Sequence, residues 1–156
     1  MEVASISRIK KELANIPPEE VQAMMLRLAK YKKENKELLS YLLFDAWNET
    51  EYIRQVKKEI ELEFGNLNHS SFYLAKKTIR KVLRTTKKYI RFSGKKETEI
   101  ELLLHFCQQL KDSKLNYKSS KVVFNLYLNQ VKRIHKVIGM LHEDLQFDYR
   151  EALEAL

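Results

Sequence analysis

Basic side chains are concentrated in two acid-free stretches of this chain. Residues 65–96 hold ten Lys and Arg and no Asp or Glu, and residues 113–142 hold six and none. Cationic side chains spaced along an extended stripe can bind the phosphates of a nucleic acid, because released counterions favour that binding whatever the base sequence. Of the net charge of +8, residues 1–64 contribute −1 (11 bases, 12 acids) and residues 65–156 contribute +9 (18 bases, 9 acids). This asymmetry predicts an anionic partner.

The first stretch predicts a helix over about residues 71–92 with one basic and one apolar face. At about 100° per residue, its central bases fall within about 140° of the circumference, and apolar side chains occupy the opposite side. Like charges one turn apart repel by roughly a few tenths of a kcal/mol per pair, and no acid four residues away relieves them. The nucleic-acid-binding candidates on this face are Lys76, Lys77, Arg80, Lys81, Arg84, Lys87, Lys88 and Arg91.

The second stretch predicts a similar helix over about residues 119–141. Its bases share an arc of about 120° with two asparagines that can hydrogen-bond a phosphate or a base edge. In an array of helical hairpins the second helices of successive pairs line one surface, so we expect the two basic faces side by side. The candidates on the second face are Lys118, Lys121, Asn125, Asn129, Lys132, Arg133 and Lys136.

Composition indicates which elements position these side chains. The 156 residues are 44% apolar and 32% charged, which predicts one soluble domain over residues 1–156. Only 3 Gly and 2 Pro are present. Tight turns between strands need these residues, so we predict an all-α fold. The same scarcity excludes the clustered-glycine loops that hold phosphates or dinucleotides.

Start and stop signals predict about seven to eight helices with short connectors. Pro17 and Pro18 precede two acids, as at many helix starts, and Asn48 with an acid three residues on resembles a capping box. Apolar side chains surround most of the segment 38–47, which predicts a buried helix. The helices are expected at about residues 3–14, 17–35, 38–47, 49–64, 71–92, 97–110, 119–141 and 143–156.

The predicted helices pair into three consecutive antiparallel hairpins, formed by 17–35 with 38–47, 49–64 with 71–92, and 97–110 with 119–141. The letters KKE at 32–34 precede LL at 38–39, and this order is echoed by KKE at 95–97 ahead of LLL at 102–104. The arrangement resembles the helical-hairpin repeats of the HEAT and armadillo families. That resemblance implies an α-α superhelix in which each pair buries its apolar face against its neighbours. A compact helical bundle is the alternative.

Cysteine use and hydropathy indicate the compartment. Cys107 is the single cysteine, which excludes an internal disulfide and a four-cysteine zinc site. Residues 1–8 show no apolar run behind a basic start, so we expect no secretory signal, and no apolar stretch is long enough for a membrane-spanning helix. The run 30–44 is similar to stretches of small uncharacterised all-helical bacterial proteins, which implies the same helical, cytoplasmic placement. We expect a cytoplasmic protein without a membrane span.

Two further groups of residues were weighed for catalysis or metal binding. Asp45 and Trp47 lie on the most apolar predicted helix, and helical-repeat DNA glycosylases combine an Asp and aromatic residues with a basic surface. The favoured interpretation is a carboxylate bonded to a Tyr or Lys near the helix end. Glu101 and His105 are one turn apart and could supply two metal ligands, but a third would have to come from another helix.

The remaining candidates have structural interpretations. His135 and His142 stand seven residues apart on the apolar side of the predicted 119–141 helix, where core histidines are usual. Cys107 lies among apolar side chains at helical spacing and is expected to be a buried, inert thiol. We therefore assign no catalytic residue, no metal, no cofactor and no small-molecule ligand.

The sequence favours a non-enzymatic helical scaffold whose basic surface binds the phosphate backbone of nucleic acid. An adaptor for an acidic protein partner is the second interpretation, and a DNA-base enzyme that uses Asp45 is the third. Basic helices that are merely solvated remain open as well. The acidic amphipathic segment 143–156, with five acids and one base, could fold across the basic faces and compete with a ligand.

Overall fold

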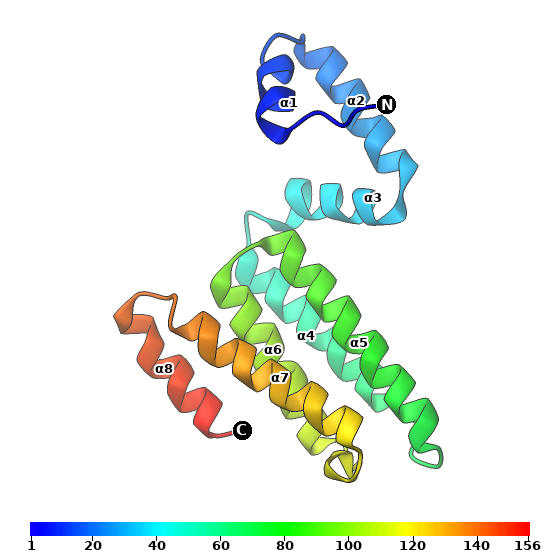
Figure 1. The fold of residues 1–156 in the computed structure, drawn as a ribbon, viewed down its shortest axis with the longest axis vertical. Coiled ribbons are helices and arrows are strands. Elements are labelled where there is room, and N and C mark those ends of the chain that lie inside the picture. Colours follow the sequence, from blue (N-terminus) through cyan, green and yellow to red (C-terminus); the bar gives the residue numbers. More distant parts are fainter. The chain divides into compact units, whose positions relative to one another are not determined.

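The computed structural model describes all 156 residues as a helical chain (Figure 1). Besides eight α-helices it has a π-helix of five residues (η1, Tyr41–Asp45) and a 3-10 turn of three residues (η2, Tyr117–Ser119), and no strand, which confirms the all-α class. The α-helices are α1 (Ile6–Leu13), α2 (Pro18–Tyr31), α3 (Lys33–Ser40), α4 (Glu49–Gly65), α5 (Phe72–Ser93), α6 (Lys96–Asp112), α7 (Lys121–Ile138) and α8 (Glu143–Glu154). None of them is long and apolar enough to span a bilayer.

The chain has two compact units, Met1–Phe44 and Asp45–Leu156, and the single domain over residues 1–156 stays a prediction. The larger unit contains α4 to α8 and both acid-free basic stretches. It also contains nearly all of the buried side chains, since Tyr41 is the one buried residue of the smaller unit. The larger unit therefore positions the candidate surface.

Helix α6 is the centre of the larger unit. Helices α4, α5, α7 and α8 all pack against it, and the two hairpins α4–α5 and α6–α7 are packed as predicted (Figure 1). Phe106 and Leu103 of α6 are buried, and the Phe106 ring meets the Phe64 ring of α4 at a centroid distance of 5.5 Å. This is the order of a helical-hairpin array, and the superhelix of the HEAT and armadillo kind stays a prediction.

Short polar side chains cap three helices of the larger unit, α4, α5 and α7. The side chain of Asn48 accepts a hydrogen bond from the backbone N–H of Glu51, and Ser71 caps α5 and Ser120 caps α7 in the same manner. Gly94 ends α5 at φ 68°, a left-handed conformation that glycine adopts without a Cβ penalty.

Glu49, at the start of α4, forms hydrogen bonds and an ion pair with the connection between α5 and α6. Its carboxylate accepts hydrogen bonds from the hydroxyls of Ser93 and Thr98, the latter at 2.5 Å, and lies 3.0 Å from the ammonium of Lys95. Thr98 is completely buried, so the carboxylate satisfies a hydroxyl that has no access to water. The contact therefore joins the end of α5 and the first turn of α6 to the start of α4.

The segment 38–47 is not the buried helix that the sequence predicts. Helix α3 ends within it and η1 follows, and Leu42, Leu43, Phe44 and Trp47 are all exposed. Burial would require an apolar partner. Between the packed helices α2 and α3 lies an apolar hollow of about 200 Å³, which Leu42 lines while it stays 53% exposed. Apolar side chains around a helix allow burial, but a second surface has to supply it.

Candidate basic binding surface

Helix α5 has the two faces that its sequence predicts. Its buried side consists of Ala75, Ile79, Val82, Leu83, Thr86 and Phe92. The opposite side carries the eight candidate bases, six of them exposed and Lys76 and Lys88 half-buried. Because a helix that packs on one side leaves the other in water, the periodicity of the sequence alone fixes this division.

Half of the candidate bases on α5 are exposed and form no ion pair with an acid. Lys77, Arg80, Arg84 and Lys87 are exposed and form no ion pair or side-chain hydrogen bond. Lys81 lies at the edge next to α4, where its ammonium is 3.2 Å from the carboxylate of Glu63. One of the eight candidate bases is therefore paired with an acid of the preceding helix, and four retain an uncompensated charge.

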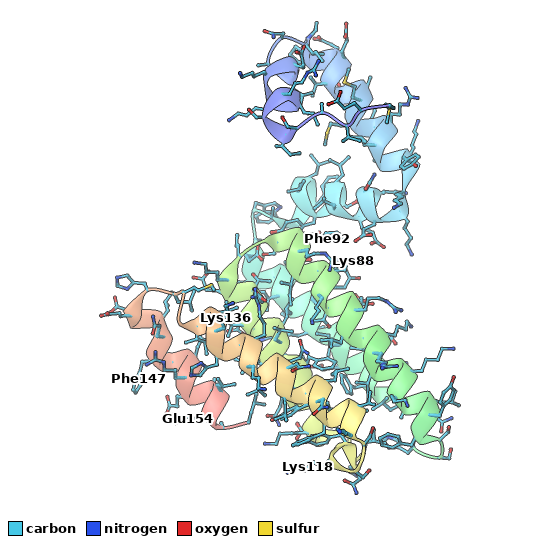
Figure 2. All side chains as sticks on the ribbon, in the orientation of Figure 1. Lys88, Phe92, Lys118, Lys136, Phe147 and Glu154 are labelled. Atoms are coloured by element: carbon cyan, nitrogen blue, oxygen red, sulfur yellow. The ribbon has the colours of Figure 1, made fainter.

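Two lysines of this face lie beside aromatic rings. The Nζ atom of Lys76 is 6.0 Å from the ring centroid of Tyr73. Lys88 lies 4.9 Å from the Tyr89 centroid and 5.9 Å from that of Phe92, and Figure 2 shows Lys88 and Phe92 near the same end of α5. Such contacts restrain a lysine while leaving its charge in place.

Helix α7 also exposes its candidate bases. Its apolar side is buried, whereas the seven candidate residues of this second face are all exposed, with Lys118 in η2 just ahead of the helix. Figure 2 shows Lys118 and Lys136 at the two ends of this face. Arg133 differs from the other bases of this face because its charge is paired. Its guanidinium donates two hydrogen bonds to Glu99 of α6, at 2.5 and 2.9 Å. This bonding holds the pKa of Arg133 above its ordinary value.

Helix α6 packs against both basic helices, whereas α5 and α7 are not an extensively packed pair. The packing thus places the apolar sides of α5 and α7 on one common helix. That their basic faces join into one continuous surface stays a prediction. Two acids that pair with these bases, Glu63 and Glu99, come from α4 and α6, the first helices of the two hairpins.

The acids of the C-terminal segment form no ion pair with the two basic faces. Helix α8 packs on α7 and α6, and none of its acids forms an ion pair with a base of α5 or α7. Its Tyr149 lies in a groove beside Glu101, where burial and the neighbouring carboxylate raise the pKa of the phenol to about 12. The hypothesis that residues 143–156 cover the bases has no support from these contacts.

The residues weighed for other chemistry are separated or already paired. Asp45 is half-buried at the end of η1 and Trp47 is 80% exposed, so the two do not form an enclosed site. Glu101 binds the Lys57 ammonium at 2.5 Å. His105 lies 3.1 Å from Glu61, and burial lowers the pKa of its imidazole. The structure thus gives Glu101 and His105 partners on α4.

The prediction that His135 and His142 are core histidines is wrong. Both are exposed, and His142 caps α8 by accepting a hydrogen bond from the backbone N–H of Asp144. Helix α7 ends at Ile138, one turn before the predicted end, so His142 falls beyond the apolar face on which the prediction placed it. His135 lies at the rim of that face rather than inside it.

Cys107 is the buried thiol that the sequence predicts. It is completely buried, and burial raises its pKa from 9.0 to about 12. Because the thiolate is the reactive form, we expect a thiol reagent at about pH 8 to modify the folded protein roughly 10³-fold more slowly than the unfolded chain. A modification time course with and without denaturant measures this ratio, and rapid reaction of the native protein would contradict it.

Sequence reasoning missed a groove between α4, α6 and α8. It has a volume of about 640 Å³, and Ile53, Leu145 and Tyr149 are among the residues that line it. Lys57 and Glu101, which are 44 residues apart in sequence and bonded to each other, also line it. No local pattern could have revealed it, because its walls come from three separate helices.

Comparison of the chain with protein-family models, curated proteins and solved structures gave no match.

Proposed function

We propose that this chain is a non-enzymatic helical scaffold that binds the phosphate backbone of nucleic acid through the basic faces of α5 and α7. The observation that carries the proposal is the set of four exposed and unpaired bases on α5, Lys77, Arg80, Arg84 and Lys87. An ordinary soluble surface mixes charges of both signs. Here a 22-residue helix has no acid at all, and its bases repel one another until an anion neutralises them.

The shape of the basic face suits a polyanion better than a single anionic group. At about 1.5 Å per residue, the stripe from Lys76 to Arg91 is about 22 Å long, which corresponds to about six base pairs of duplex. The bases follow one another at one-turn intervals along this length. Exposed bases of α7 add to the same charge. Since the asparagines Asn125 and Asn129 are the only amides on these faces, we expect weak sequence preference.

A salt titration of duplex DNA binding tests the proposal. If about six phosphates are neutralised, the logarithm of the binding constant falls with a slope of about −5 against the logarithm of salt concentration. Fluorescence anisotropy of a labelled duplex at several salt concentrations gives this slope. Absence of binding at low salt, or a flat response, would refute the proposal and leave the bases as solvated surface.

An adaptor for an acidic protein is the second candidate, and the smaller unit favours it. Helices α2 and α3 and the start of η1 expose large apolar side chains, as protein-binding surfaces do. These residues are Met24, Met25, Leu26, Leu28, Leu38, Leu42, Leu43 and Phe44, the last three of them in η1. If the partner is a protein, the binding constant should depend less on salt concentration than it does for nucleic acid, because salt does not screen the burial of apolar surface. For either candidate we place the protein in the cytoplasm, since its lone cysteine requires no oxidising compartment.

A further inference from the structure

We propose that the first half of the α5 basic face binds single-stranded nucleic acid, with one base stacked on Tyr73 and the adjoining phosphates held by Lys77, Arg80 and Arg84. This inference rests on the proposed function and names the form of nucleic acid that the same face recognises. Three features of α5 carry it: an exposed aromatic ring, a hollow beside the ring, and unpaired cations around the hollow.

Tyr73 is an aromatic ring placed in water among cations. Its side chain is 70% exposed, and it is the only exposed tyrosine of residues 45–156. At about 100° per residue it falls within the arc of the bases and away from the core side that Ala75 and Ile79 occupy. Packing of α5 therefore does not require this ring. A base can stack on an exposed aromatic face, and such stacking tolerates any base because each has a π-face.

The surface beside the ring is hollowed. A hollow of about 440 Å³ runs along α5, and every residue that lines it belongs to this one helix: Tyr73, Lys76, Lys77, Thr78, Arg80, Lys81 and Arg84. The distance along the helix axis from Tyr73 to Arg84 is about 16 Å at 1.5 Å per residue. Lys76 reaches the ring and Lys81 is held by Glu63, whereas Lys77, Arg80 and Arg84 are unpaired. The free cations thus lie next to the ring and along the hollow.

A single strand can use both the ring and the cations, whereas a duplex can use only the cations. Bases within a duplex are stacked on one another and cannot reach a ring outside it, whereas the bases of a single strand can turn outward onto aromatic side chains. The second half of α5 lacks a free ring, because Tyr89 is half-buried, Phe92 is buried and Lys88 covers both. The stacked base is therefore assigned to the Tyr73 end, and the rest of the face contacts phosphates alone.

The test compares three probes: oligo(dT) of about 16 nucleotides, a duplex of equal length, and an abasic strand with the same phosphates. Tyr73→Ala is expected to weaken oligo(dT) binding about 5- to 150-fold, the range that corresponds to about 1–3 kcal/mol for one stacked base. Duplex and abasic-strand binding should change by less than about twofold, since both lack an accessible base. Tyr73→Phe, which keeps the ring, should bind oligo(dT) like the unchanged protein.

Tyr31→Ala is the matched control, because Tyr31 is 79% exposed and belongs to α2, which carries none of the candidate bases. It should leave binding of all three probes unchanged. Equal losses for oligo(dT) and the abasic strand, or no loss for either in Tyr73→Ala, would overturn stacking while salt-dependent duplex binding still supported the proposed function. If the unchanged protein binds none of the probes at low salt, both proposals are wrong.

Discussion

Replacing Lys77, Arg80, Arg84 and Lys87 with glutamine is expected to weaken duplex DNA binding by about 10³- to 10⁴-fold at about 0.1 M salt. Each phosphate contact releases about 0.9 counterion, which is worth nearly tenfold in affinity at this salt concentration. The four side chains are exposed and make no ion pair or side-chain hydrogen bond, so their replacement removes ligand contacts and no internal ones. The slope of the salt titration should also fall by about 3–4.

A variant with the same total charge separates local contacts from net charge. Glutamine at Lys10, Lys11, Lys30 and Lys32, all exposed in the smaller unit, also removes four charges from the chain's +8. We expect this control to keep most of the affinity and a slope close to that of the unchanged protein. Equal losses in the two variants would show that DNA responds to net charge and that α5 is not the binding face.

Phe106→Ala is expected to lower the free energy of unfolding of the larger unit by about 3–5 kcal/mol. The side chain is 0% exposed in the central helix α6, and its ring packs edge-on against Phe64. Removing the ring leaves a cavity between helices that cannot move together without disturbing the others packed on α6. For a chain of this size the midpoint of thermal unfolding should fall by about 2–4 °C per kcal/mol. Guanidinium unfolding followed by circular dichroism gives the free energy.

Phe147→Ala makes the same chemical change on the surface. Phe147 of α8 is 72% exposed and points outward in Figure 2, so its removal should change stability by less than about 0.5 kcal/mol. A loss of less than about 1 kcal/mol in Phe106→Ala, or equal losses in both variants, would contradict the central position of α6.

The two faces of α5 follow from local spacing alone. Bases and apolar residues of α5 are separated by the helical period, and Ser71 and Gly94 mark its ends. The burial of Cys107 could be predicted in the same way, because its apolar neighbours recur at helical intervals. Such features depend on residues within one or two turns of each other, and the sequence contains them directly.

Ion pairing of the candidate bases could not be predicted from the sequence. Lys81 meets Glu63, 18 residues away, and Arg133 meets Glu99, 34 residues away. Both acids belong to neighbouring helices, and only the packing of those helices decides which acid comes within reach of which base. Fewer bases of α5 are therefore left without an acidic partner than the periodic pattern alone predicts.

Sequence by itself determined that this protein is helical, where most of its helices begin, and which side of α5 and α7 is basic. Tertiary structure alone decided that α6 is the central helix, that Leu42, Leu43, Phe44 and Trp47 are exposed, and that the acids of α8 form no ion pair with the candidate bases. The physical reason is the distance along the chain over which each kind of interaction acts. Periodicity and caps act between residues a few positions apart, whereas burial requires a second surface from a distant part of the chain.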